Sequence, residues 1–200
     1  RVLDRDDRLL FSALYPERVY SSFGAIPEIL VRTLLYIENR ELLESGFPYR
    51  NPAVEWDRLA DAAMRAGLRV VDRSRKVPGG STLATQIEKY RHSPGGFTPS
   101  IKEKIRQMVS ASLRSYLEGR ETMEARRRII LDYINSMPLA AVAGYGEVTG
   151  LGDGLWAWYG ADLDKASQRL ATHPAAREQD LAAGAAVYKQ ALSLTLAQRR

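Results

Sequence analysis

Two adjacent glycines lead directly into a run of hydroxyl and amide side chains, Gly79-Gly80 followed by Ser81-Thr82-Leu83-Ala84-Thr85-Gln86. This pattern predicts the start of a helix, with Ser81 or Thr82 as its N-cap. The free N–H groups of a helix start also suit a phosphate or another anion, and glycine lets a ligand approach the backbone closely. The stretch alone leaves both interpretations open, an ordinary helix entry and an anion site.

Most of the remaining sequence is patterned for helices. Pro27 opens a segment whose apolar residues recur at helical spacing to about residue 43. By the same criterion we expect helices over residues 56–66, 80–91, 100–117, 122–135, 163–171 and 178–196. Short apolar pieces within residues 1–25 predict a small hairpin that turns near Asp6-Asp7. The expected fold is therefore mainly α, with a small N-terminal hairpin or extended segment.

Two stretches are expected to be irregular. Residues 92–99 contain two glycines and two prolines, which favours a loop and makes this stretch the best candidate for a mobile lid. Residues 136–154 contain five glycines, and we expect a long irregular segment there. Long irregular segments in compact domains are usually functional.

The composition limits the partners. The 200 residues fit one domain, and the net charge of +5 favours an anionic partner such as a nucleic acid, a phospholipid surface or a phosphorylated substrate. The absence of cysteine excludes disulfides and thiolate metal sites, and His92 and His173 lack metal-ligand spacing, so we assign no metal site. No apolar run reaches membrane-spanning length. Because the chain starts at Arg1, we interpret it as a domain excised from a longer protein, with any anchor outside this fragment.

Several polar residues have both a functional and an ordinary interpretation. Glu38 follows the apolar run 34–37, and a desolvated carboxylate suits proton transfer, although a solvated Glu paired with Arg40 or Arg32 is the simpler alternative. Gln107 is either a site residue or a surface residue in mid-helix. Asn135 is either a ligand group or a helix C-cap.

Five segments follow one another in a specific order along the chain. They are Ile26-Pro27 with Leu34-Leu35-Tyr36-Ile37-Glu38-Asn39-Arg40, Gly79-Gly80-Ser81-Thr82 with Gln86, Ser100-Ile101 with Ala111, Arg126 with Ile129-Ile130 and Tyr133-Ile134-Asn135, and Trp158-Tyr159-Gly160. In order and residue type these segments resemble the motifs of glycosyltransferase family 51. This family comprises the peptidoglycan transglycosylase domains of class A penicillin-binding proteins and the monofunctional transglycosylases. The resemblance covers nearly the whole chain, residues 1–200, as a single domain.

The resemblance implies a lysozyme-like helical domain at the outer, periplasmic face of the bacterial cytoplasmic membrane. Its partners would be lipid II, the growing glycan strand linked to undecaprenyl pyrophosphate, and the membrane surface, but not nucleic acid. A general base would take the proton of the acceptor 4-hydroxyl, which attacks the donor anomeric carbon with inversion while the lipid pyrophosphate leaves. The family has no tightly bound cofactor, although Mg²⁺ or another divalent cation can accompany the pyrophosphate. A transpeptidase or another domain in the parent chain is compatible with this family.

Site residues carry over position by position. Glu38 corresponds to the base, and Lys104 and Arg126 to cations near the pyrophosphates, where fixed positive charge stabilises a leaving group that gains negative charge. The remaining cleft residues implied by the resemblance are Arg40, Gly80, Ser81, Thr82, Gln86 and Asn135.

The sequence also departs from the family pattern. Most importantly, Gln107 occupies the position of the second essential Glu, and Gln has neither charge nor useful acidity. Glu103 stands one turn earlier and Glu147 lies further along the chain, so either is a candidate for a shifted carboxylate, but Glu103 with Ser100 also forms a capping-box pattern. Smaller departures are Asn39 for Asp, Leu42 for Phe, Ser45 for His, and Ala84-Thr85 for Thr-Gln.

These departures leave two interpretations within one fold. One is an active, divergent transglycosylase that relies on Glu38 and a ring of cations. The other is a catalytically impaired domain that binds lipid II or glycan without polymerising it. A glycan hydrolase usually needs two carboxylates, which Gln107 argues against, and a nucleic-acid module would need a reading motif that the sequence lacks.

Overall fold

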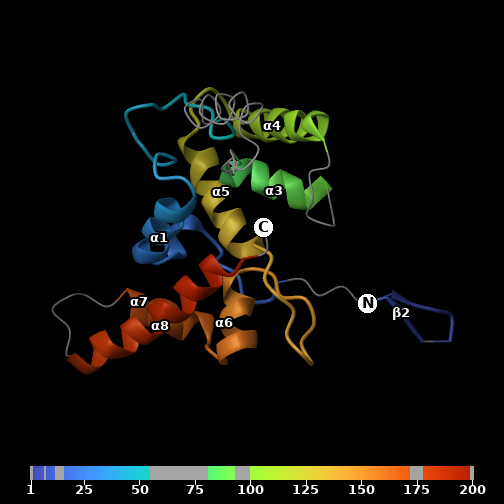
Figure 1. Cartoon of the computed structure of the whole chain (residues 1–200), viewed down its shortest axis with the longest axis vertical. Helices are drawn as coiled ribbons and strands as arrows, with labels where there is room; N and C mark the ends of the chain where they lie inside the picture. Colours follow the sequence, from blue (N-terminus) through green and yellow to red (C-terminus); the bar gives the residue numbers. More distant parts are fainter. Residues whose placement is uncertain are drawn as a thin grey trace, which may run out of the picture. The chain divides into compact units, whose positions relative to one another are not determined.

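The computed structural model describes residues 2–6, 8–11, 16–54, 81–92, 100–171 and 178–198, and in these ranges the fold is mainly α-helical (Figure 1). The α-helices are α1 (Glu28–Glu38), α3 (Leu83–His92), α4 (Ile101–Ser115), α5 (Met123–Ser136), α6 (Leu151–Tyr159), α7 (Leu163–Leu170) and α8 (Glu178–Leu196). This confirms the mainly α fold and agrees with a lysozyme-like domain. The helix expected over residues 56–66, the pair Gly79-Gly80, His173 and all but the first residue of the loop expected over 92–99 lie outside the described residues. His92, the first residue of that expected loop, belongs to α3.

The N-terminal hairpin is confirmed. Strand β1 (Val2–Leu3) pairs antiparallel with β2 (Leu9–Phe11). The carboxylate of Asp4 closes the connecting turn, since its Oδ1 accepts hydrogen bonds from the backbone N–H groups of Asp6 at 2.8 Å and Arg8 at 2.9 Å.

Contacts divide the chain into two compact units, which we call the terminal and the central unit. The terminal unit contains the described residues up to Ile29 and from Ile134 onwards, and the central unit runs from Leu30 to Tyr133. A single domain over residues 1–200 stays a prediction.

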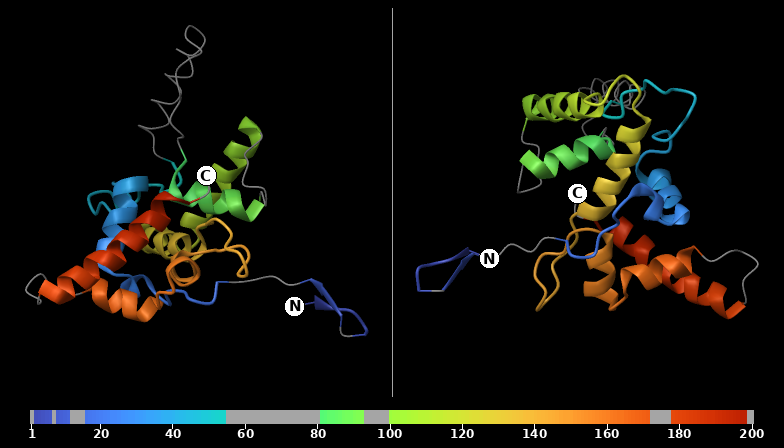
Figure 2. Two further views of the ribbon diagram at one scale, coloured as in Figure 1. Left: turned by 60° about the horizontal axis from the view of Figure 1, so that its bottom comes forward. Right: turned by 180° about the vertical axis from the view of Figure 1, so that it is seen from behind.

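The terminal unit is built on α6, α7 and α8. Helix α8 packs against both α6 and α7, and Figure 2 shows α7 and α8 side by side. Asp162 caps α7 by accepting the backbone N–H of Lys165 at 3.0 Å. The core of this unit is aliphatic, and its most buried members are Met137, Leu139, Val148, Leu151, Leu155 and Ala191.

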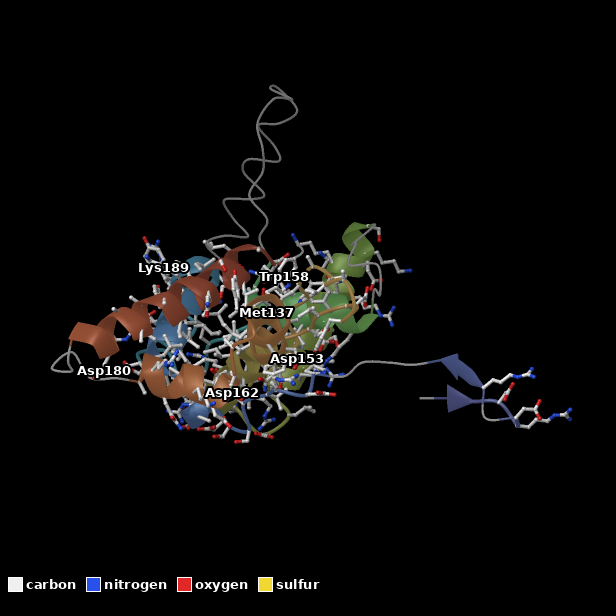
Figure 3. The ribbon with its side chains drawn as sticks, turned by 90° about the horizontal axis from the view of Figure 1, so that it is seen from below. Met137, Asp153, Trp158, Asp162, Asp180 and Lys189 are labelled. Atoms are coloured by element: carbon white, nitrogen blue, oxygen red, sulfur yellow. The ribbon has the colours of Figure 1, made fainter. Side chains whose placement is uncertain are left out.

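A buried carboxylate and an amide fix the chain that leads into α1. Asp153 accepts hydrogen bonds from the backbone N–H groups of Glu17 and Arg18 and from the Arg18 guanidinium, at 2.9 to 3.1 Å. Asn135 makes two hydrogen bonds of 2.9 Å with the backbone N–H and carbonyl of Tyr20. Figure 3 shows Asp153 among the side chains of this unit, whereas Asp180 lies at the outer end of α8.

The structure corrects the expected irregular segment. The segment ends at Gly150, and α6 begins at Leu151 with Gly152 and Gly154 inside it. A Cβ atom on Gly150, which has a φ of +81°, would lie 2.4 Å from the carbonyl oxygen of Asn135, and one on Gly152 would lie 2.0 Å from that of Arg18. Gly150 and Gly152 are therefore required for close packing, and Gly152 and Gly154 lie within a helix and do not mark a loop.

Gly152→Ala is expected to destabilise the chain by about 1–3 kcal/mol, the usual cost of overpacking, because the new methyl group collides with the backbone of Arg18. Urea unfolding measures this change. The matched control is Gly24→Ala, where a Cβ has open space, and we expect a change within about 0.5 kcal/mol. Equal stability of the two variants would contradict the packing role.

The central unit packs α3 and α4 beside α5 (Figure 1) around small side chains, with Ala53, Val54, Ala84 and Ala111 at the centre. Helix α1 ends at Glu38 and not near residue 43 as expected. The chain turns after Glu38, and Arg126 binds carbonyl groups of the turn segment, as described below.

Candidate active site

Three side chains from three helices form a hydrogen-bonded chain in the central unit. Glu38, the last residue of α1, has an exposed fraction of only 7 %. Gln86 of α3 donates from Nε2 to Glu38 Oε2 at 3.0 Å, and Tyr133 of α5 donates its hydroxyl to Gln86 Oε1 at 2.9 Å. The structure therefore brings the predicted base and one predicted cleft residue together.

The order of donors and acceptors orients this chain. A carboxylate only accepts hydrogen bonds, so the amide nitrogen of Gln86 must face Glu38, and the hydroxyl of Tyr133 holds the amide oxygen on the other side. Tyr133 was expected only as a core contact. A tyrosine at an apolar position of a helix gives no sequence signal that its hydroxyl has a polar partner.

Thr82 is the N-cap of α3. Its backbone N–H donates a hydrogen bond to Thr85 Oγ1 at 2.9 Å, and the backbone N–H of Thr85 donates one to Thr82 Oγ1 at 3.3 Å. This reciprocal pair resembles a capping box. The Thr82 hydroxyl also donates to the carbonyl of Ala53. The capping interpretation is thus confirmed for Thr82. Ser81 is half-buried just before it, Gly80 lies outside the described residues, and the anion site stays a prediction.

Arg126 is buried, with 1 % exposed, and it binds the segment that follows α1. Its five N–H donors are all used within the protein. The acceptors are Thr122 Oγ1 and the carbonyls of Leu42, Glu44, Phe47 and Arg50. Burial, followed by the charge of Arg50, lowers the pKa of Arg126, which nevertheless stays charged at neutral pH.

This arrangement leaves the Arg126 guanidinium no N–H for a pyrophosphate oxygen. The geometry therefore does not support the role that the family resemblance implies for Arg126, a cation that binds the pyrophosphates. Its partners lie between 76 and 84 residues away, apart from Thr122, so no local sequence pattern could have revealed them.

Helix α4 carries the position of the second acid. Ser100 Oγ accepts the backbone N–H of Glu103 at 3.2 Å, which confirms the predicted N-cap, and the Glu103 carboxylate lies 3.9 Å from Arg106. Gln107 is buried, so the alternative of a surface residue is wrong. Lys104 is half-buried on the same helix.

Two predicted cleft residues have identified contacts. Arg40 is exposed, and its guanidinium lies 4.1 Å from the ring centre of Tyr36 while its Nε donates to the Tyr36 carbonyl. Asn135 belongs to the terminal unit and pairs with the backbone of Tyr20. Neither contact tests a role in substrate binding. Glu147, the other candidate for a shifted carboxylate, is exposed.

Within the described ranges, no group of three or more His, Cys, Asp or Glu side chains is arranged to hold a metal ion. None of the helices in this part of the chain is both long and apolar enough to cross a bilayer.

A family model described as Transglycosylase matches residues 8–188, which is most of the chain. Among curated proteins, none matches this sequence.

Proposed function

Because the chain belongs to the transglycosylase family, a family of peptidoglycan glycosyltransferases, we propose that it polymerises lipid II into glycan strands with Glu38 as the general base. The observation that supports this proposal best is the chain of hydrogen bonds from Tyr133 through Gln86 to Glu38. These hydrogen bonds support the proposal because the carboxylate that aligns with the family's base is buried and held in one orientation.

The proposed step is a single displacement. The acceptor 4-hydroxyl donates its proton to the Glu38 carboxylate, and its oxygen forms the new bond to the donor anomeric carbon with inversion. The bond from that carbon to the pyrophosphate oxygen breaks, and undecaprenyl pyrophosphate leaves with the electron pair. Gln86 holds the carboxylate in one orientation, which reduces the cost of reaching the reactive geometry.

Positive charge is expected near the leaving group. We assign this role to Lys104 and Arg40, because Arg126 has all its donors on protein groups in this arrangement. A divalent cation such as Mg²⁺ would accompany the substrate pyrophosphate. We propose no protein-held cofactor.

The proposed location and partners follow from the substrate. Lipid II and the growing strand carry a lipid pyrophosphate, so the domain would work at the outer face of the cytoplasmic membrane. The net charge of +5 suits an anionic membrane surface and the anionic substrate.

A second candidate is a domain that binds lipid II or glycan without polymerising it. It is favoured by one observation, that uncharged Gln107 is buried at the position of the second acid. Its test compares binding of labelled lipid II with polymer formation. Binding without polymer by the wild type, together with a gain of polymer in Gln107→Glu, would support this candidate.

Tyr133→Phe is expected to lower kcat of lipid II polymerisation about fivefold with little change in KM. The loss of one hydrogen bond releases the Gln86 amide, and a bond of about 1 kcal/mol corresponds to roughly this factor. Steady-state kinetics measure the effect, with Tyr49→Phe at an exposed position as the control. An unchanged kcat in Tyr133→Phe would show that the hydroxyl does not orient the site.

A further inference from the structure

Two aromatic side chains lie exposed on the second half of α6, in the terminal unit. Trp156 and Tyr159, which we call the α6 aromatic pair, each have an exposed fraction of 43 %. Residues three apart lie on the same side of a helix, so the two rings are neighbours on one surface. Tryptophan and tyrosine are enriched at interfaces, because each combines a large apolar ring with a polar edge. Neither ring belongs to the candidate active site, which lies in the central unit.

A polar contact holds each ring of the pair. The Arg18 guanidinium lies 4.5 Å from the centre of the Trp156 ring, which is a cation–π contact. The Tyr159 hydroxyl makes a hydrogen bond of 2.6 Å with Ser193 Oγ of α8. Side chains that already have one orientation lose less conformational entropy when a ligand binds. The α6 aromatic pair is therefore preorganised for binding.

A buried carboxylate fixes the Arg18 edge of this surface. Asp153 is 3 % exposed and accepts hydrogen bonds from Arg18 Nη1 at 3.1 Å and from the Tyr145 hydroxyl. Tyr145 belongs to the irregular segment that precedes α6. Three separate stretches of the terminal unit thus meet at Asp153 and hold the guanidinium over Trp156.

Hydrogen-bonding groups border the rings. In the described part of the chain, the side-chain hydrogen bonds of Arg18 all come from Nη1, so Nε and Nη2 remain to donate to a ligand. The Glu17 side chain is 71 % exposed and can accept. This combination matches a pyranose sugar, because the C–H face of the sugar packs on an aromatic ring while hydroxyl and N-acetyl groups at its rim form hydrogen bonds.

The charges around the rings favour an uncharged ligand. Arg18, the cation in contact with Trp156, is paired with Asp153 at 3.1 Å and with Glu17 at 3.4 Å. One cation and two carboxylates leave no excess positive charge to attract a phosphate or an anionic lipid headgroup. Sugar rings carry no charge and are compatible with this group.

We propose that the α6 aromatic pair, with Arg18 at its edge, is a second binding surface for the amino-sugar strand. This proposal rests on the proposed function, in which that strand is the product. Two neighbouring rings on a helix present one aromatic face to each of two successive sugars. Because the surface lies outside the candidate active site, it would hold the strand at a second place on the same chain. Two binding places raise the effective concentration of the strand at the protein between additions.

The test is isothermal titration calorimetry of the full chain with N-acetylated chitotetraose, a soluble amino-sugar tetramer. We expect binding by the wild type and at least about tenfold weaker binding by Trp156→Ala, because the ring supplies apolar contact area. Tyr159→Ala should also weaken binding, and it tests the surface independently if Trp156→Ala fails to fold. The matched control is Trp158→Ala, which removes the same side chain from another side of α6, with 47 % exposed, and should bind like the wild type.

Three results would overturn the proposal. One is a wild type that polymerises lipid II but does not bind the tetramer. Another is unchanged binding by folded Trp156→Ala, or an equal loss of binding in Trp158→Ala. The third is a change from dimer to monomer in Trp156→Ala by analytical ultracentrifugation, which would make the surface a contact between copies of the chain.

Binding of the tetramer requires neither a lipid pyrophosphate nor turnover, so it is measured separately from the proposed function. A wild type that binds the tetramer but forms no polymer from lipid II would contradict the proposed function and leave the sugar surface supported. Glu38→Gln is expected to bind the tetramer like the wild type, because its substitution lies in the central unit and the α6 aromatic pair in the terminal unit. A loss of tetramer binding in Glu38→Gln would place the sugar at the candidate active site and overturn the second surface.

Discussion

Glu38→Gln is expected to lower the rate of lipid II polymerisation by about 10²- to 10⁴-fold, the range over which a positioned general base contributes. The substitution keeps the shape of the side chain and removes its ability to accept a proton at neutral pH. The side chain stays hydrogen-bonded, because the new amide can present its oxygen to Gln86 Nε2. The fold and the affinity for lipid II should therefore change little. Polymer formation from labelled lipid II measures the rate, and direct binding measures the affinity.

The other carboxylates serve as matched comparisons. Glu121→Gln removes an exposed charge and should leave the rate unchanged. Glu103→Gln and Glu147→Gln test whether one of these residues replaces the second acid that Gln107 lacks. Wild-type rates in Glu38→Gln would contradict the assignment of the base, and a collapse of the rate in only Glu103→Gln or Glu147→Gln would move the base to that residue.

Local signals predicted much of the helical fold. Ser100 with Glu103 marked the start of α4, and Pro27 marked the start of α1, because capping and proline chemistry act within one turn of chain. Local signals of this kind do not predict the structure where packing against a segment far away in the sequence determines it. The glycines of α6 resemble turn residues in the sequence, but they are explained by the backbone of Arg18 and the side chain of Leu139 that pack against them.

In the candidate site, too, the sequence predicts some residues, whereas contacts with distant segments determine others. Glu38 and Gln86 were singled out by the order of motifs, and the structure joins them by a hydrogen bond. The sequence predicts Tyr133 as a core contact and Arg126 as a cation near the pyrophosphates, and it does not predict the hydrogen bonds that these side chains make. Their partners come from another helix and from a turn far away in the sequence. A single sequence does not show which carbonyl groups lack a donor, and those groups determine the position of Arg126.

Arg126→Met is expected to destabilise the chain by about 3–5 kcal/mol, at the upper end for a single substitution. Methionine fills a similar volume but donates no hydrogen bond, so four carbonyls and one hydroxyl lose a charge-assisted donor at once. The stability of Arg126→Lys should fall between that of the wild type and that of Arg126→Met, because three donors on one nitrogen cannot reach all the acceptors that the guanidinium binds. Urea unfolding measures all three proteins. Arg127→Met, at an exposed position next in the chain, should cost less than about 0.5 kcal/mol.

The comparison of stability with activity separates two roles for Arg126. The segment that it binds begins directly after Glu38, so its release should displace the carboxylate and reduce polymerisation together with stability. Glu38→Gln, by contrast, should lose activity with its stability intact. If Arg126→Met kept the wild-type stability and lost only affinity for lipid II, the guanidinium would be a pyrophosphate ligand and the carbonyl contacts would be secondary. We expect the first pattern, because a side chain with all five donors on the backbone and Thr122 has to break those bonds before it can bind a substrate.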